Sequence, residues 1–350
     1  MKKEKKQILK IAAVYTGAVI GAGLASGQEL MIFFVRYGAR GLWGAAFAGM
    51  LFAFLGAMLL SRAKSLSCSS YEQYLENVFG KKLAAVFYRI VQAFLAVSFC
   101  VMLSGSGALL SEQFGLPPAA GVFLTAAVSF LVLQGNLKGL TVVNVLLVPL
   151  MLFGMILVCS AFLLGQTREA WLRFSIGDSR FLVSLLLYVS FNMLSGAAVL
   201  VPLSKTASSA RSAAAGGFLG GVLLLLVVML TSVTLYIAGH SVLGEQLPML
   251  VLSRNLSRYA SFFYAAVLYM AMLTTAAANG FSVVEHFAQH GKSRRGTAAV
   301  FCLLATPLSL IPFTRLVEAS YTLFGILGFA LLCGIAADWF CHNKSENRRF

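Results

Sequence analysis

One short stretch of this chain combines glycines with polar side chains inside a long apolar run. Four glycines recur between residues 17 and 27, and Gln28 and Glu29 follow them directly. Glycine weakens a helix by about 1 kcal/mol relative to alanine. Close helix packing through GxxxG spacing is one explanation. The other is an unwound stretch near residues 20–23, because polar groups at membrane depth need a partner or a water-filled cavity.

Such a break would expose backbone amides at the start of the second half-helix. Those amides suit a carboxylate, because N–H groups and the helix dipole both favour an anion there. The residues expected to bind a ligand in this way are Gly21, Ala22, Gly23 and Leu24.

A second polar interruption lies in the apolar run 180–203, ahead of Pro202. In one interpretation, Asn192 bonds a neighbouring helix and nothing more. In the other, this helix is also broken, and the carbonyls at the end of its first half suit an ammonium group. A zwitterion fits the two breaks together. The residues expected to contribute here are Ser190, Phe191, Asn192 and Ser195.

Glu29 is the one carboxylate placed well inside an apolar run. It would either reach outward and pair with Arg36 or face a cavity and serve in gating or proton coupling. No HExxH, GxSxG or P-loop pattern occurs, and no cysteine pair has CxxC spacing. The sequence therefore predicts no catalytic residues, and we expect the protein not to be an enzyme.

The composition is that of an integral membrane protein. Of the 350 residues, 59% are hydrophobic and 11% are charged, whereas soluble domains carry about 25% charged residues. The apolar runs are continuous rather than alternating, which predicts helices rather than a β-barrel. We expect ten membrane-spanning helices, at residues 8–36, 41–61, 83–110, 118–134, 141–165, 180–203, 213–239, 258–286, 297–312 and 316–340.

The basic residues predict an orientation for these spans. With a cytoplasmic N-terminus, 19 of the 27 Lys and Arg residues fall on the cytoplasmic side and 8 on the other. Short cytoplasmic loops are enriched in Lys and Arg. We therefore expect a multi-pass protein of the cell membrane with both termini cytoplasmic. The net charge of +15 is explained by anionic lipid, and no nucleic-acid partner is expected.

The two halves of the chain resemble each other at an offset of 173 to 176 residues. The matched pairs are Tyr15 with Tyr188, Gly23 with Gly196, Phe87 with Phe263, and Glu112 with Glu285. A unit of five spans crosses the membrane an odd number of times, so the second copy must be inverted. Inverted repeats with broken helices are typical of secondary transporters, with the solute bound between the copies. We expect one transmembrane domain over residues 1–350, with repeats at 8–165 and 180–340.

The stretch GAVIGAGLASGQE, residues 17–29, resembles the bacterial YkvI-type amino-acid permease family of the amino acid–polyamine–organocation superfamily. This resemblance implies an all-α LeuT-type fold of five plus five inverted helices, with helices 1 and 6 broken. It implies a secondary active transporter, an ion-coupled symporter or exchanger, of an amino acid or similar small nitrogenous solute. The alternative is a receptor subunit of the same fold that senses amino acids without bulk transport.

The resemblance extends to the sodium site of LeuT-type symporters. G-x-x-I-G-x-G at residues 17–23 is similar to their first-span pattern, and A-x-x-T-T at residues 271–275 is similar to their A-x-x-T-S. It implies a sodium ion held by Gly17, Ile20, Ala271, Thr274 and Thr275. In the alternative interpretation, the threonine hydroxyls bond carbonyls one turn back. Apart from Na+ or H+ as coupling ion, no cofactor is expected, and the solute and oligomeric state are left open.

Overall fold

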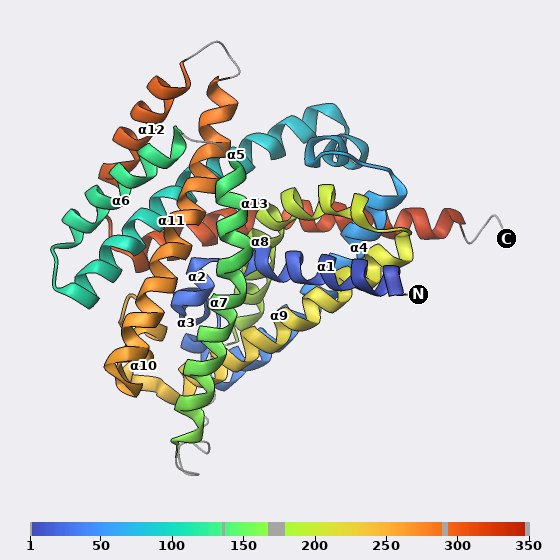
Figure 1. Ribbon diagram of the computed structural model, residues 1–350. Coiled ribbons are helices and arrows are strands. Elements are labelled where there is room, and N and C mark those ends of the chain that lie inside the picture. Colours follow the sequence, from blue (N-terminus) through green and yellow to red (C-terminus); the bar gives the residue numbers. More distant parts are fainter. Residues whose placement is uncertain (1, 135–136, 167–178, 289–292, 347–350) are drawn as a thin grey trace.

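The computed structural model describes residues 2–134, 137–166, 179–288 and 293–346, and the described residues form a bundle of helices (Figure 1). The first expected span is divided into three pieces, α1 (Lys2–Val19), α2 (Ala22–Ser26) and α3 (Gln28–Phe33). The longer helices that follow are α4 (Gly38–Ser65), α5 (Tyr71–Phe114), α6 (Pro118–Leu133), α7 (Leu137–Leu164), α8 (Phe181–Leu203), α9 (Ala210–Ala238), α10 (Pro248–Leu256), α11 (Arg258–Ala288), α12 (Arg294–Leu308) and α13 (Phe313–Glu346).

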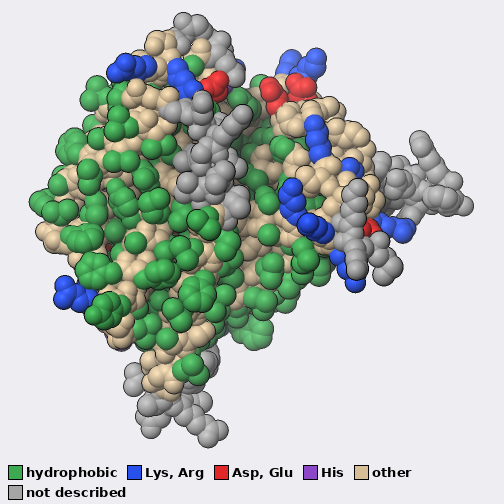
Figure 2. Space-filling model, in the orientation of Figure 1, with side chains coloured by type: hydrophobic (Ala, Val, Ile, Leu, Met, Phe, Trp, Pro, Cys, Tyr) green, Lys and Arg blue, Asp and Glu red, His purple; other side chains and the backbone are tan. Residues whose placement is uncertain are grey.

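Many of these helices can cross a membrane. Among the described residues, seven are long and apolar enough to do so, namely Gln28–Ser65, Tyr71–Phe114, Leu146–Leu164, Phe181–Thr206, Ala210–Ser241, Arg258–Ala288 and Phe313–Trp339. The helices α6 and α12 are apolar but shorter, with 16 and 15 residues. Figure 2 shows apolar side chains over a broad face of the molecule, with Lys and Arg mainly at its margins. A span count of ten is not established by helix length alone.

The helices pack in two groups. In the first, α1 and α4 each contact α8 and α9, and in the second, α5, α6, α11 and α12 contact one another. α7 contacts α11 and α9, whereas α13 contacts α8 and α5, so these two helices connect the groups (Figure 1). Each group takes two helices from the first half of the chain and two from the second. This arrangement leaves room for a site between the groups.

Glycines let α4 and α9 approach closely. A methyl carbon added at Gly217 would lie 2.5 Å from the Gly56 carbonyl oxygen, and one added at Gly49 would lie 2.5 Å from a Leu225 side-chain carbon. Small residues at such contacts allow backbones to meet across membrane helices. The glycine cluster of α9 therefore serves packing within the first group.

The first span is interrupted at two places. Gly21 is extended (φ −95°, ψ −178°), and its N–H donates to Val19 O (2.9 Å), so α1 ends there. The second break is at Gly27, whose φ of 83° is the left-handed conformation that glycine adopts at little steric cost. The sequence predicted the first break but missed the second, although a Ser-Gly dipeptide is a turn signal.

The predicted break in the sixth span is wrong. α8 is a continuous helix of 23 residues. Its polar side chains bond to carbonyls of their own helix: Ser190 Oγ donates to Leu186 O (2.6 Å) and Asn192 Nδ2 donates to Tyr188 O (3.0 Å). Ser195 Oγ donates to Phe191 O in the same way (3.4 Å). Such bonds satisfy polar groups in lipid without unwinding the helix.

Candidate functional site

A cavity of about 380 Å³ lies at the first break, between the two groups of helices. It falls within the size range of small-molecule sites in proteins. Its walls come from α1, α2, α3, α5, α8, α11 and α13. The lining residues with polar or aromatic side chains are Glu29, Phe94, Ser98, Phe191, Asn192, Ser195, Thr275, Asn279, Ser282 and Tyr321.

Glu29 is the charged residue of this cavity. Its side chain turns back from α3 so that the carboxyl lies against Gly23, where an added methyl carbon would overlap Glu29 Oε1. The residue is 5% exposed, and its Oε2 atom has no hydrogen-bond partner in the described part of the chain. A buried charge without a partner is costly, so the carboxyl is available for a proton or a cationic ligand.

The outward pairing of Glu29 with Arg36 does not form. Arg36 Nη1 instead lies 2.5 Å from Glu318 Oε1, and both side chains are substantially exposed. Glu29 is directed inward because every residue of its helix, α3, is buried.

The residues predicted to bind the solute are brought together in part. Gly21, Ala22, Gly23, Phe191, Asn192 and Ser195 line the cavity. Leu24 and Ser190 are fully buried and do not line it, and the Ser190 carbonyl packs against Gly328 of α13. The first backbone bond of α2 runs from Ala25 N–H to Gly21 O (3.0 Å), so the amides of residues 22–24 belong to its first turn.

The residues expected to hold sodium are less well assembled. Thr275 lines the cavity, whereas Gly17, Ile20, Ala271 and Thr274 do not. The Thr274 hydroxyl donates to Ala271 O (3.2 Å), one turn back in α11, which is the alternative that the sequence left open. A methyl carbon added at Gly17 would lie 3.0 Å from Val148 of α7, so this glycine faces α7.

The cavity also has an aromatic wall that the sequence analysis missed. The rings of Phe191 and Tyr321 lie 4.5 Å apart between centroids, and Phe94 lies 6.1 Å from Tyr321. Asn279 donates through Nδ2 to Ser98 Oγ (2.9 Å), which joins α11 to α5. Asn279 could have been found as a polar residue in an apolar run, but no local pattern distinguishes the rings from ordinary core residues.

Polar contacts hold α2 and α3 against their neighbours. The Gln28 amide donates to Glu245 O (3.0 Å) and accepts from Thr314 Oγ1 (3.1 Å), in the amide orientation that satisfies both groups. The Tyr264 hydroxyl donates to Ala25 O (2.5 Å). The lining extends along α8 to Val199 and along α11 to Ser282, toward the C-terminal ends of these two helices.

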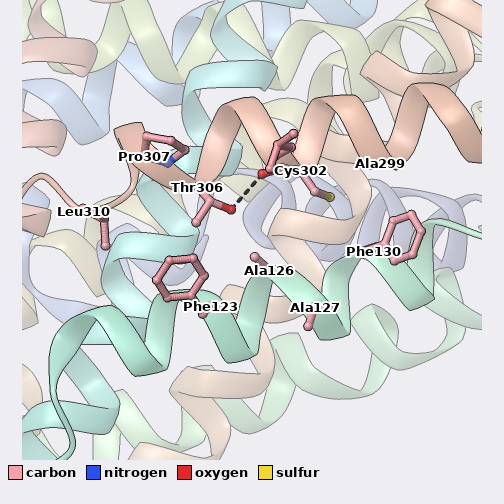
Figure 3. Close-up of a pocket in the computed structure, with 10 residues that line it drawn as sticks. Phe123, Ala126, Ala127, Phe130, Ala299, Cys302, Thr306, Pro307 and Leu310 are labelled. Atoms are coloured by element: carbon pink, nitrogen blue, oxygen red, sulfur yellow. Dashed lines mark hydrogen bonds between the residues drawn. The ribbon is translucent and has the colours of Figure 1, made fainter.

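A second hollow lies on the outside of the bundle between α6 and α12 (Figure 3). Apart from Thr306, its lining side chains are apolar or thiol groups, and the Thr306 hydroxyl donates to Cys302 O (2.8 Å). With so few polar groups to orient a ligand, this groove is a weaker candidate than the cavity at Glu29.

Two proteins of Bacillus subtilis are similar to this chain over nearly its whole length. The uncharacterized membrane protein YkvI is 30% identical over 338 residues, covering 95% of this chain and 96% of YkvI. The uncharacterized protein YyaD is 22% identical over 325 residues, covering 93% of this chain and 94% of YyaD. A scan against protein-family models gives no match.

Solved structures with the same fold are LeuT-fold transporters. The inward facing conformation of Mhp1 matches with a TM-score of 0.69 and 12% identity, over 95% of this chain and 76% of Mhp1. MhsT in complex with L-phenylalanine matches at 0.66 and 19%, over 93% of this chain and 87% of MhsT. A Na+-coupled sialic acid symporter matches at 0.59 and 15%, over 93% and 78%. At such low sequence identities, the structural similarity shows a shared fold and says nothing of the solute.

Proposed function

Because the chain belongs to the family of the membrane protein YkvI, we propose that it is a secondary active transporter of an amino acid or similar small nitrogenous solute. The observation that carries the proposal is the cavity at the break between α1 and α2, into which the unpaired Glu29 carboxyl projects. An interrupted helix beside a polar cavity between two helix groups is the arrangement in which transporters bind solutes. The fold shared with MhsT, a protein solved in complex with L-phenylalanine, supports the same proposal.

We infer further that the chain spans the membrane ten times as two inverted repeats, with α6, α12 and the interrupted first span included. The pairing of corresponding helices within each group supports this arrangement.

Both termini are expected on the cytoplasmic side, because of the bias in Lys and Arg. A single cysteine placed at residue 3 should react with a membrane-impermeant maleimide only after the cells are opened. The chain's own cysteines are first replaced by alanine or serine. Labelling of that cysteine in intact cells would contradict the orientation.

Exchange of solute across liposomes is the direct test of transport. Liposomes containing the purified protein and loaded with unlabelled amino acids or amines should accumulate the labelled solute above its external concentration. Protein-free liposomes are the control. Solute binding without any counterflow would contradict transport and would fit the receptor that the sequence left as an alternative.

We propose that transport of the solute is coupled to an ion gradient. We favour sodium as the ion, because Thr275 lines the same cavity as the break in the first span. Uptake should fall when sodium is replaced by choline at fixed pH. Thr275→Val should reduce uptake more than Thr274→Val, because the Thr274 hydroxyl is bonded within its own helix. Equal uptake in both media would exclude sodium and leave the proton as coupling ion.

A further inference from the structure

We propose that the solute is recognised as an organic ammonium ion whose charged group pairs with Glu29 and whose apolar part lies against the rings of Phe94, Phe191 and Tyr321. This inference rests on the proposed transport function and names the solute class for the same cavity.

The charge of the cavity favours a cation. Glu29 is the one charged side chain among its lining residues, which include no lysine, arginine or histidine. The carboxyl is 5% exposed, and Oε2 lacks a partner among the described residues. Burying a carboxylate becomes favourable only when it is paired and hydrogen-bonded. A ligand that carries N–H donors and a positive charge supplies both.

The aromatic wall favours an organic cation. The Phe191 and Tyr321 rings are 4.5 Å apart between centroids, and Phe94 extends the wall at 6.1 Å from Tyr321. Glu29 lines the same cavity as these three rings. A cation within about 6 Å of an aromatic ring centroid is attracted by the ring. Carboxyl and rings therefore act on the same ligand.

The polar side chains of the cavity are also suited to a ligand that donates hydrogen bonds. The Asn192 amide nitrogen donates to Tyr188 O, and the Asn279 amide nitrogen donates to Ser98 Oγ. Their side-chain oxygens are acceptors. An ammonium ion brings N–H groups to such acceptors, whereas a carboxylate brings more acceptors.

A carboxylate on the solute gains little here. It would meet the Glu29 carboxyl, and no cationic side chain lines the cavity to offset the repulsion. The opposing helix α2 has five residues, so few peptide dipoles are aligned behind its first amides. We therefore expect an amine to bind more tightly than the amino acid with the same side chain.

A divalent metal ion fits less well. Among the described residues, no group of three or more His, Cys, Asp or Glu side chains is close enough to hold a metal. A cavity of about 380 Å³ with an aromatic wall is also far larger than one ion requires.

The test compares the binding of three probes that share the same phenyl group and differ in their charged groups. The probes are 2-phenylethylamine, L-phenylalanine and 3-phenylpropanoate, and binding to the purified protein is measured by isothermal titration calorimetry. The amine is expected to bind most tightly, the zwitterion less tightly and the carboxylate not at all. Glu29→Gln should weaken amine binding by about tenfold to a hundredfold, because a charged hydrogen bond is lost.

Two further variants separate the charge from the rings. Tyr321→Leu should weaken amine binding by about twofold to thirtyfold through loss of a ring face. Glu76→Gln removes an exposed carboxylate of α5, outside the cavity, and should leave binding unchanged. Monodisperse elution of each variant in detergent shows that its fold is retained.

Three results would overturn the inference: tighter binding of the zwitterion or carboxylate than of the amine, equal amine binding by wild type and Glu29→Gln, or no binding of the amine. None of them removes the transport proposal, because counterflow of another solute would still establish transport. Conversely, tight amine binding that depends on Glu29 but gives no counterflow would support the recognition site and contradict transport.

Discussion

Replacing Gly23 by leucine is expected to abolish solute binding while the protein still inserts and folds. Even a methyl carbon at this position would overlap Glu29 Oε1. A leucine side chain would displace the carboxyl and fill the part of the cavity beside the break. The loss should exceed a hundredfold in affinity and should be measured on purified protein with the amine or amino acid that the wild type binds best.

A matched pair of smaller changes makes this prediction sharper. Gly23→Ala and Gly21→Ala add the same methyl group two residues apart. A methyl carbon at Gly21 meets no other atom within 4 Å, and the φ of −95° there is accessible to alanine. Binding should therefore fall much further for Gly23→Ala than for Gly21→Ala. Gly154→Ala, on α7 outside the cavity, would make only ordinary contacts with Tyr264 and Phe263 and serves as the control for folding. Equal binding by both cavity variants would contradict the role of Gly23 in seating Glu29.

Replacing Glu29 by glutamine is expected to remove the pH dependence of solute binding and uptake. A carboxyl group exchanges a proton and an amide does not. If the carboxyl pairs with an ammonium ion, protonation removes the negative charge, so binding to the wild type weakens as the pH is lowered through the titration of Glu29. The variant should bind weakly and equally at every pH. Uptake by proteoliposomes over a pH series is the measurement.

Glu76→Gln is the control for this experiment, because it removes an exposed carboxylate without touching the cavity. Its pH profile should match that of the wild type. A Glu29→Gln profile that also matches the wild type, in both shape and rate, would mean that this carboxyl neither binds the solute nor carries a proton.

Helices and membrane character could be predicted from the sequence because they depend on local properties. Long continuous apolar runs must satisfy their backbone groups internally in lipid, which fixes them as helices. The first break was also predictable, since four glycines within residues 17–27 lower helix stability there.

The sixth span shows where a local pattern stops being decisive. The sequence left two alternatives here, a broken span or a bond from Asn192 to a neighbouring helix. The structure shows neither, because the Ser190, Asn192 and Ser195 side chains each reach a carbonyl one turn back in α8 itself. The first span differs because the backbone freedom of its glycines makes a helix less stable there, and Gly21 is extended.

The sequence alone determined an all-helical membrane chain with a weak point in its first span and one carboxylate beside it. Only the tertiary structure decided what that carboxylate meets. Glu29, Phe94, Phe191 and Tyr321 lie far apart in the chain, on α3, α5, α8 and α13, and converge because the two groups of helices leave a cavity between them. No local periodicity encodes that convergence, since each ring reads in its own helix as an ordinary core residue. Arg36 and Glu318 are likewise distant in sequence, and the fold brings them together as an ion pair. Arg36 therefore does not pair with Glu29.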